Sequence, residues 1–517
     1  MYKKLLKAVT NLGSPQVLLV GDFLLDSYVY GDALRISPEA PVQVLKVVNR
    51  AYSCGGAGAV AADLTALGAG CICIGAVGAD ANGALLREKL TELEADTSGI
   101  LTVSDRPTIS KQRLIGLAQH RHRQQLLRID DECTEPFDEA DYDKILKLYS
   151  EKLSQADIVC IQDYNKSVVS PVLCPELIKL AARADKKVLV DPPAMDDYSK
   201  YTGASLIAPN RREASKTVGF AIETVEDASR AAQLIADKLN VEVVVITLDK
   251  DGAFLHTSDT SEHIPTIPRS VYDVTGAGDM VLAMLAVSLA AGFACTTAVQ
   301  LANIAGGIEV EKFGVATVTV DEIVNEIIAE NRGKGGKIHD IDTLLDVLRF
   351  HRQQKETIVF TNGCFDVLHR GHIEFLKFCE GQGDVVVLGL NSDRSVRQIK
   401  GSGRPINNQH DRAAVLAALE TVDYIVAFDE PDPLKTIEKV KPDVLIKGQD
   451  WADKGVVGRR FVESGGGKVV LAPLVEGKSS TSTIEKMQTM QDRRSGPEDP
   501  GAPGFRVAQQ KKEVSNE

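Results

Sequence analysis

Short runs of Val, Ile and Leu, each ended by polar residues, recur along this chain and alternate with helical patterns. Before residue 330 the clearest runs are Val17–Val20, Ile158–Ile161, Val188–Val190, Leu206–Ala208 and Val243–Ile246. Apolar runs without alternation are typical of strands buried on both faces, so this pattern predicts a mainly parallel sheet covered by helices. Ligands of such sheets gather at the carboxyl ends of the strands, which is where the polar residues follow.

A second α/β series begins after a Gly- and Lys-rich segment at 331–337 and a helical pattern at about 340–354. Its apolar runs are Ile358–Phe360, Val385–Leu390, Tyr424–Phe428, Val444–Lys447 and Val469–Leu471. Shorter alternating segments at 40–48 and 108–130 predict a small extra sheet that stands off the first one. Because 517 residues exceed what one core can hold, we expect several parts: a first domain over 1–330, a linker and connecting helix over 331–355, a second domain over 356–488 and a disordered tail over 489–517.

The charge and cysteine content argue against several classes of function. A net charge of -13 disfavours a general affinity for nucleic acids or anionic membranes. The longest apolar stretch, Met280–Ala294, is shorter than the ~18–20 residues of a membrane span, and the first residues lack the apolar core of a signal peptide. Nine cysteines without metal-ligand spacing indicate a reducing cytoplasm and no metal held by the protein itself.

One catalytic motif is the segment Asp273-Val-Thr-Gly-Ala-Gly-Asp279, which opens a long apolar helix. A Gly-Ala-Gly turn at a helix start presents free backbone N–H groups to an anion at the positive end of the helix dipole. Asp279 follows where a carboxylate can take a proton from an attacking hydroxyl. The motif is neither a Walker A loop nor a Rossmann fingerprint, because it lacks Gly-Lys-Ser/Thr and the third glycine. Taken alone, it fits a phosphoryl-transfer site and a Gly-rich helix start equally well.

The surroundings of this motif resemble the ribokinase-like carbohydrate kinases in order and spacing, over about residues 10–325. The resemblance implies an α/β fold, a ribokinase-like three-layer α/β domain with a small β lid that excludes water. It implies that Asp279 is the general base and that the anion hole consists of Gly276, Ala277 and Gly278. It places ATP and its Mg²⁺ at Asn210, Arg211, Arg212, Glu213, Thr247 and Asn303, and the sugar at Asp22, Gly55 and Gly56.

Two residues depart from that family, and one cluster is unassigned. The family carries Asn a few residues after its Gly-Gly pair, where this chain has Ala59, and Lys after Asp-Pro, where this chain has Pro193. Loss of the Asn amide predicts an altered sugar preference or weaker sugar binding. The basic cluster formed by 119–123 and Arg128 is either a solvated hairpin tip or a clamp for a phosphate already on the sugar.

The other catalytic motif is His369-Arg-Gly-His372, which opens a helix shortly after a strand pattern that ends in Thr361-Asn-Gly363. Two imidazoles at this spacing can both reach one phosphate while backbone N–H groups hold its oxygens. A purely structural role for both histidines is the alternative, and the glycine between them at a helix start disfavours it.

This stretch resembles the nucleotidyltransferases of the HxGH type over about residues 356–488, which implies a Rossmann-like α/β nucleotidyltransferase domain. Supporting pieces are Asn391-Ser-Asp393, Arg404-Pro405, Lys447-Gly448 and the 479–484 segment. By this resemblance His369 and His372 stabilise charge on the α-phosphate of the incoming nucleotide. The nucleotide would be bound by Thr361, Asn362, Gly363, Phe365, Lys447, Ser480, Thr481 and Ser482, with Mg²⁺ held mainly by the ATP phosphates.

Together the two parts resemble the bifunctional heptose kinase/adenylyltransferases of bacterial lipopolysaccharide synthesis, in order over about 480 residues. Matching segments are 21–31, 35–41, 162–166, 271–279, 404–405 and 417–423. The resemblance implies an enzyme that uses ATP and a phosphorylated heptose to make ADP-heptose, and the likeness to ribokinase-like kinases implies a homodimer. The cysteines indicate the cytoplasm, and the net charge argues against nucleic acid or membrane partners. Three alternatives stay open: another sugar phosphate, CTP in place of ATP, and an inactive first domain that only binds and dimerises.

Overall fold

The computed structural model describes residues 2–117, 124–267, 269, 276–312, 316–333 and 336–473. The chain divides into two units, Met1–Glu330 and Asn331–Glu517, and each is described by itself. The tail expected at 489–517 lies outside the described residues, as do 119–123 of the basic cluster. Within the described residues, no helix is both long and apolar enough to cross a membrane.

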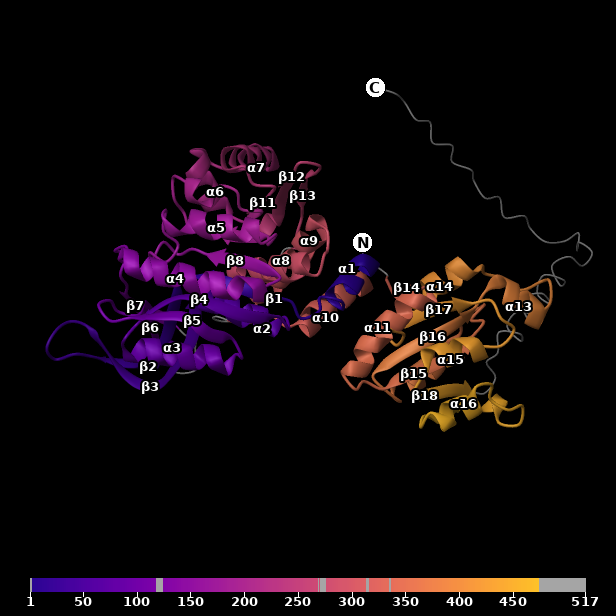
Figure 1. The fold of residues 1–517 in the computed structure, drawn as a ribbon. Helices are drawn as coiled ribbons and strands as arrows, with labels where there is room; N and C mark the ends of the chain where they lie inside the picture. The colour runs from indigo at the N-terminus through magenta and orange to yellow at the C-terminus, as the bar shows by residue number, and fades with distance from the viewer. Residues whose placement is uncertain are drawn as a thin grey trace, which may run out of the picture. The chain divides into compact units, whose positions relative to one another are not determined.

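The first unit is built on a nine-stranded sheet with the order β13-β12-β11-β10-β9-β8-β1-β4-β5 (Figure 1). Its strands are β1 (Gln16–Gly21), β4 (Gly70–Gly78), β5 (Asp96–Val103), β8 (Ile158–Gln162), β9 (Val188–Asp191), β10 (Leu206–Ile207), β11 (Val243–Thr247), β12 (Ala253–Thr257) and β13 (Ser261–Ile264). Neighbours from β11 to β5 pair in parallel, and β12 and β13 add antiparallel strands at one edge. The predicted parallel sheet is thus confirmed, because apolar runs without alternation need cover on both faces.

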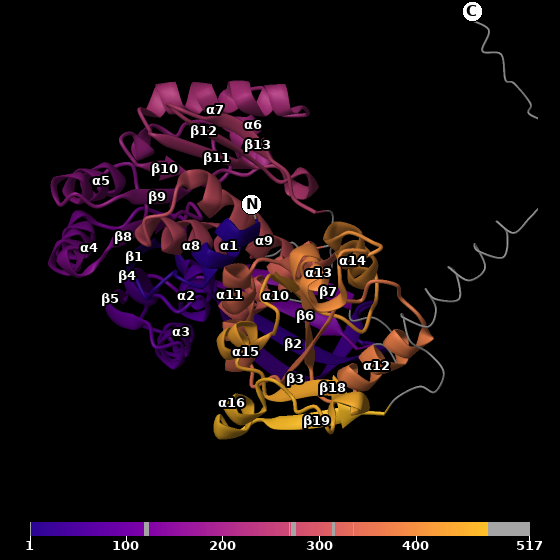
Figure 2. The same ribbon diagram turned by 90° about the vertical axis from the view of Figure 1, so that its right-hand side faces the viewer.

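Helices lie on both faces of this sheet, which makes a three-layer α/β fold (Figure 2). One face shares its core with α4 (Glu139–Lys152), α5 (Leu173–Arg183), α6 (Arg211–Val218) and α7 (Val225–Leu239). The other face is packed by α2 (Ala57–Ala66), α8 (Ala277–Ala290) and α9 (Cys295–Glu309). The unit also contains α1 (Tyr2–Val9), α3 (Ala81–Glu92), α10 (Val320–Gly333) and the 3-10 turns η1 (Leu153–Gln155), η2 (Ser199–Tyr201) and η3 (Asp249–Asp251).

A separate four-stranded sheet has the order β3-β2-β6-β7. It consists of β2 (Phe23–Ile36), β3 (Gln43–Gly56), β6 (Ser110–Gly116) and β7 (Gln124–Asp131). This is the small extra sheet that the sequence predicts, and it is larger than predicted because β2 follows β1 almost without a break. Large apolar side chains are exposed on or beside it, namely Leu34, Ile36, Val42, Val47, Val48, Tyr52, Leu127 and Ile129.

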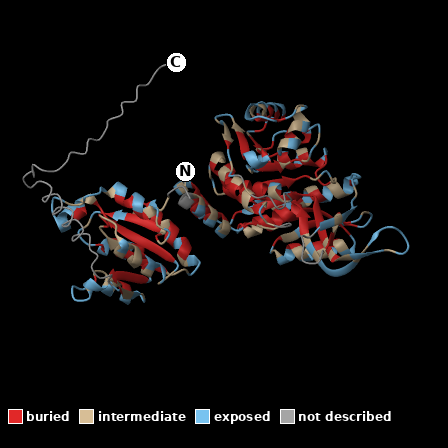
Figure 3. Ribbon diagram, turned by 180° about the vertical axis from the view of Figure 1, so that it is seen from behind, coloured by how far each residue is buried: buried red, intermediate tan, exposed pale blue. Residues whose placement is uncertain are grey.

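The second unit is a six-stranded parallel sheet with the order β14-β17-β16-β15-β18-β19. Its strands are β14 (Ile338–His339), β15 (Ile358–Gly363), β16 (Val385–Asn391), β17 (Tyr424–Phe428), β18 (Val444–Gly448) and β19 (Lys468–Ala472). Its helices are α11 (Ile341–Gln353), α12 (Arg370–Glu380), α13 (Asp393–Lys400), α14 (Gln409–Ala417), α15 (Leu434–Val440), α16 (Arg459–Ser464) and η4 (Gln449–Trp451). Figure 3 shows the central strands of each unit as its buried layer.

The segment expected as a linker and connecting helix is largely part of the second unit. β14 pairs in parallel with β17, and α11 packs against β15, β17 and α15. The expectation of a connector over 331–355 therefore needs correction from residue 338 onward. The physical reason is that one face of α11 is apolar, and Leu344, Val347 and Leu348 on that face are completely buried.

Candidate active sites

The first candidate site is a pocket of about 280 Å³ at the carboxyl ends of the central strands of the first unit. It brings together six residues predicted from the sequence, namely Asn210, Glu213, Thr247, Gly276, Gly278 and Asp279. Further lining residues include Gln162, Tyr164, Asp191 and Pro193. The pocket is therefore where the Gly-Ala-Gly turn meets the ends of β8, β9 and β11, as expected for a ligand site in a parallel sheet.

Asp279 lies in the first turn of α8 with 5% of its surface exposed. Its Oδ1 accepts hydrogen bonds from Gln162 Nε2 at 2.9 Å and from Tyr164 Oη at 3.2 Å. Burial, and then the negative charge of Glu309, raise the pKa of Asp279 to about 8. A carboxylate with a raised pKa is a stronger base than an exposed one, so Asp279 is suited to accept a proton near neutral pH.

The turn before Asp279 requires glycine at one position. Gly276 is the N-cap of α8 and adopts a φ of +98°, which side chains rarely tolerate. A Cβ atom there would also collide with the carboxyl group of Glu309. Ala277 and Gly278 follow as the first residues of α8, whose N-terminal N–H groups have no partner within the helix. These amides can hold phosphate oxygens; residues 273–275 of the motif lie outside the described part of the chain.

The residues predicted to bind ATP divide into two groups. Asn210 caps α6 and forms a capping box with Glu213, and both line the pocket together with Thr247. Arg211, by contrast, pairs with Asp249 and Asp251 on η3 and donates to backbone carbonyls. Its guanidinium is thus committed to the fold.

Two more of the predicted ATP ligands also lie away from the pocket wall. Arg212 is exposed to solvent. The side-chain amide of Asn303 donates to the carbonyl of Ile264 at 2.9 Å. Neither residue lines the pocket.

Asp22 is predicted from the sequence to bind the sugar, and the structure shows which groups its carboxylate contacts. Its carboxyl group is fully buried and accepts backbone N–H groups of Tyr164, Lys166 and Val168, so its oxygens hold the loop after β8. Burial raises the pKa of Asp22 to about 6. The carboxylate that contacts the Gly55 backbone is Asp26, because a Cβ on Gly55 would clash with it.

Asp26 is the sugar-site candidate that sequence reasoning missed. It lies on β2 of the four-stranded sheet β3-β2-β6-β7, called the lid sheet below. Its side chain is buried, with 4% of the residue exposed, and it forms an ion pair with Arg113 on β6. Gly56, with a φ of +57°, approaches the backbone carbonyl of Asp22. The lid sheet thus brings a charged side chain toward the Gly55-Gly56 turn. Arg128, on the same sheet, pairs with Asp130 two residues away and is half exposed.

The two departures from the ribokinase pattern both lie at or near this site. Ala59 is 4% exposed within α2, and Pro193 lines the pocket. The carbonyl of Pro193 accepts the Tyr198 hydroxyl at 3.1 Å. In this chain Asp279 accepts its hydrogen bonds from Gln162 and Tyr164 with Ala59 and Pro193 in place.

The second candidate site is the histidine pair at the start of α12. His369 is the N-cap residue of this helix, and its ring stacks on that of His372 with centroids 3.9 Å apart and an interplanar angle of 18°. The Phe365 ring lies 5.1 Å from that of His372. Burial, then His369 and Lys400, lower the pKa of His372 to about 4, so its imidazole is neutral near pH 7. A neutral ring next to a helix N-terminus can donate to a phosphate without repelling other cations.

The remaining residues predicted for the nucleotide surround β15 and β18. Thr361 is buried and donates to the carbonyl of Ile446 at 3.0 Å. Lys447 donates to the carbonyl of Asn362 at 3.1 Å and lies 5.2 Å from the Trp451 ring centroid. Burial lowers the pKa of Lys447 to about 8.

Gly363 and Phe365 shape the turn after β15. Phe365 has a φ of +44°, and a Cβ on Gly363 would lie 2.8 Å from its ring. This close fit places the Phe365 ring beside His372. Ser480, Thr481 and Ser482 lie outside the described residues.

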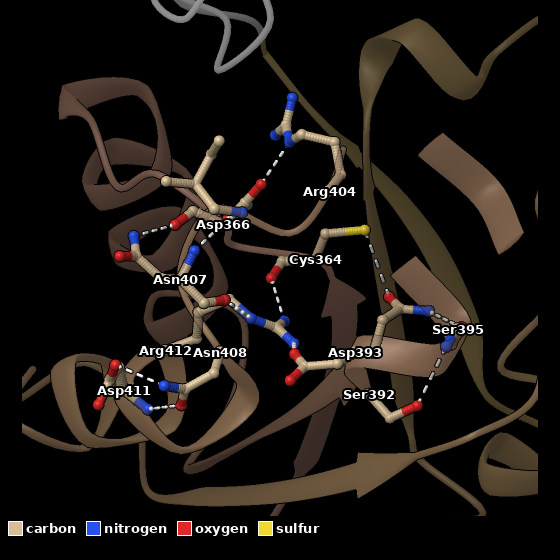
Figure 4. A network of polar contacts seen from close by, with 12 residues as sticks. Cys364, Asp366, Ser392, Asp393, Ser395, Arg404, Asn407, Asn408, Asp411 and Arg412 are labelled. Carbon is tan, nitrogen blue, oxygen red and sulfur yellow. Dashed lines mark hydrogen bonds and ion pairs between the residues drawn. The ribbon is translucent and has the colours of Figure 1, made fainter. Parts of the chain in front are cut away.

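A polar network that sequence reasoning did not foresee fixes the loop beside the histidines (Figure 4). Asp366 has no exposed side-chain surface, pairs with Arg404, and accepts the N–H groups of Ile406 and Asn407 at 2.7 and 3.0 Å. Burial alone would raise the pKa of Asp366, but these N–H groups and Arg404 lower it. The local signal for this network is Asp366 directly after Phe365, a pattern that by itself is equally typical of a residue that turns the chain.

Known proteins resemble this chain in both units. A family model of pfkB carbohydrate kinases matches residues 15–322, and a cytidylyltransferase-like model matches residues 360–466. The bifunctional protein HldE of Geobacter metallireducens is 42% identical over 471 residues, which cover 91% of this chain and 95% of that protein. The bifunctional protein HldE of Wolinella succinogenes is 41% identical over 92% of this chain and 98% of its own length.

A solved structure supports the fold of the first unit. Phosphofructokinase-2 of Escherichia coli, in complex with substrates and products, superposes with a TM-score of 0.51 at 21% identity. The match covers 61% of this chain and 99% of that one. The two family models and the relatives matched over nearly their full length show that the chain is a bifunctional enzyme, a carbohydrate kinase joined to a nucleotidyltransferase. It belongs to the family of HldE bifunctional proteins.

Proposed function

We propose that this enzyme carries out two steps in the synthesis of ADP-heptose. The first unit would transfer phosphate from ATP to C1 of D-glycero-β-D-manno-heptose 7-phosphate. After a separate phosphatase has removed the 7-phosphate, the second unit would join heptose 1-phosphate to the adenylyl group of ATP and release pyrophosphate. The observation that supports the proposal is that Asp279 and the His369/His372 pair each lie at a helix N-terminus suited to phosphate, in a chain of this family.

In the kinase, Asp279 would accept the proton of the C1 hydroxyl as that oxygen attacks the γ-phosphorus of ATP. Gln162 and Tyr164 orient the carboxylate through their hydrogen bonds. The N–H groups from Gly276 to Gly278 would hold the oxygens of the transferred phosphate at the positive end of α8. We assign the sugar to Asp26, Gly55 and Gly56, because they meet where the lid joins the main sheet.

ATP of the kinase would lie along Asn210, Glu213 and Thr247, which line the same pocket as Asp279. Mg²⁺ would be held mainly by the ATP phosphates, and the carboxylates of Asp191 and Glu213 offer oxygen ligands of the kind it prefers. When bound, Mg²⁺ neutralises phosphate charge. Ala59 and Pro193 leave the groups around Asp279 intact, which favours an active kinase over a binding module.

In the transferase, His369 and His372 would stabilise charge on the α-phosphate of ATP, and Lys447 would hold its triphosphate. Lys447 and the histidines come from β18 and α12, and both flank the end of β15. The protein needs to supply position and charge rather than a covalent intermediate. The histidine pair contacts phosphate and does not read the base, so adenine specificity rests on family membership.

The partners and location follow from the same reasoning. We propose that two copies pair through the lid sheets, because that sheet exposes a group of large apolar side chains that would be buried between subunits. Both substrates are soluble phosphates, so we place the enzyme in the cytoplasm, without nucleic acid or membrane partners.

The test is to separate the two activities. The full chain is incubated with a sugar-phosphate panel, ATP and CTP, and products are identified by mass. D279N should abolish phosphorylation and spare nucleotidyl transfer, and H372A should do the reverse, since the sites lie in different units. In each variant the retained activity shows that the other unit is intact, and a thermal unfolding profile checks the fold of the substituted unit. Loss of both reactions in a folded variant would refute two independent sites.

A further inference from the structure

Within the described part of the chain, the guanidinium group of Arg404 has hydrogen-bond partners for only some of its N–H groups. Its Nε donates to the Asp366 carboxylate, and 13% of its side chain is exposed. Nη2, however, is buried and has no hydrogen-bond partner among the described residues. A buried N–H of a charged group without an acceptor is unfavourable and rare, so an acceptor from a ligand is the natural explanation. Figure 4 shows the outer nitrogens of Arg404 pointing away from the network.

The neighbouring Arg412 provides the contrast. Its Nε donates to the carbonyl of Asn407 at 3.0 Å, Nη1 to the carbonyl of Cys364 at 2.6 Å, and Nη2 to Asp393 at 2.7 Å. Only 1% of its side chain is exposed. Each nitrogen of Arg412 therefore donates to the protein and holds the loops together, whereas Nη2 of Arg404 has no acceptor among the described residues.

Asp366 connects Arg404 to the catalytic histidines. It stands three residues before His369, and it fixes the 404–407 loop through Arg404 and two backbone N–H groups. Burial raises the pKa of the Cys364 thiol, and the positive charges of Lys400 and Arg404 oppose this rise. Lys400 also contributes to the lowered pKa of His372. These cationic side chains are therefore close enough to influence the site. Nη2 of Arg404 is thus held in a positively charged region close to the start of α12.

The transferase reaction brings two anions together, the triphosphate of ATP and the phosphate of the acceptor sugar. In the proposed function Lys447 and the histidine pair bind the ATP phosphates, so the acceptor phosphate still needs a binding group. We propose that Arg404 binds the phosphate of the acceptor, a sugar 1-phosphate, and that Asp366 is the positioning residue that aims it. This inference rests on the proposed transferase function. In the step, an oxygen of the acceptor phosphate forms a bond to the α-phosphorus of ATP. The bond from that phosphorus to the bridging oxygen breaks, and pyrophosphate leaves with the electron pair.

The experiment measures transferase kinetics of the full chain with heptose 1-phosphate and ATP. The variants are R404A, R404K and D366N, and the matched control is R394A, whose side chain is 68% exposed on α13. R404A should raise the KM for heptose 1-phosphate roughly 10- to 100-fold, because one charge-assisted interaction is lost. R404K should lie between R404A and the native enzyme, since Lys keeps the charge but not the planar fork. D366N should shift the same KM, and R394A should not.

A second readout separates ligand binding from a merely structural role. Trp451 is the single tryptophan of the chain and lies next to Lys447, so its fluorescence follows ATP binding at the transferase. ATP affinity should be unchanged in R404A and R404K. If both substitutions weaken ATP binding as much as sugar-phosphate binding, or leave the KM for heptose 1-phosphate unchanged, the proposal is wrong. If R404A does not fold, R404K decides alone. A native enzyme that forms no ADP-heptose refutes the proposed function instead.

Discussion

The two activities should respond to pH in opposite directions. The kinase needs Asp279 without its proton, and the pKa of this carboxyl is raised to about 8. The transferase needs Lys447 with its proton to bind triphosphate, and the pKa of this ammonium is lowered to about 8. His372, with a pKa of about 4, stays neutral over the whole range and adds no dependence. Raising the pH through 8 therefore ionises Asp279 and activates the kinase, while it removes the positive charge of Lys447 and weakens the transferase.

The magnitude follows from the ionised fractions of the free enzyme, which are what kcat/KM reports. At pH 7 about one Asp279 in ten is ionised, and at pH 9 about nine in ten are, so kinase kcat/KM should rise about tenfold. The charged fraction of Lys447 changes by the same factor in the opposite direction. The ratio of kinase to transferase kcat/KM should thus rise about a hundredfold between pH 7 and pH 9.

The assay follows ADP formation for the kinase and pyrophosphate release for the transferase, on one preparation in the same buffers. Both sugar phosphates lose a proton near pH 6, so their charge changes little between pH 7 and pH 9. Parallel profiles, or a kinase profile that is flat between pH 6 and pH 9, would refute the assignment of Asp279 as a base with a raised pKa.

Two substitutions test the packing of the first unit. G276A should lower kinase activity more than a hundredfold, because its Cβ would collide with Glu309 at the anion hole. The control G292A is also at a positive φ but has open space around it, so it should cost only about 1 kcal/mol of stability. Kinase rates and thermal midpoints of both variants check this, and equal effects on the kinase rate would contradict it. Y201F should destabilise the first unit by about 2 kcal/mol, because it removes the 2.6 Å hydrogen bond from the Tyr201 hydroxyl to the fully buried Asp163 carboxylate. Urea unfolding followed by circular dichroism measures this loss, and an unchanged midpoint would show that the bond contributes no net stability.

Much of the fold could be predicted from the sequence, because strands of a parallel sheet buried on both faces consist of continuous apolar residues. The runs at Val17–Val20 and Val385–Leu390 became β1 and β16 with nearly the predicted bounds. β14 could not be predicted, since two residues carry no periodicity and the strand exists only through pairing with β17. β2 was not predicted, because it follows β1 with only Asp22 between the two strands.

The candidate sites were predictable where their chemistry is local. The Gly276–Asp279 turn and the histidine pair are each set by spacing within a few residues, and the structure shows the geometry that such spacing allows. Asp22 shows the limit of this reasoning. Its place after β1 made it a sugar-site candidate, but its oxygens are taken by backbone N–H groups more than 140 residues away in the chain.

What the sequence by itself determined is the pair of expected reaction types. The helix start with His-x-Gly-His indicates its phosphate chemistry locally, whereas the helix start with Gly-Ala-Gly-Asp does so only together with the motifs that surround it in the sequence. What only the tertiary structure decided is the surroundings of those groups. Gln162 reaches Asp279 across 117 residues, and Asp366 holds Arg404 across 38. Contacts of this kind, and the burial that sets the pKa of Asp279, depend on how the strands and helices pack, so no local pattern could have specified them.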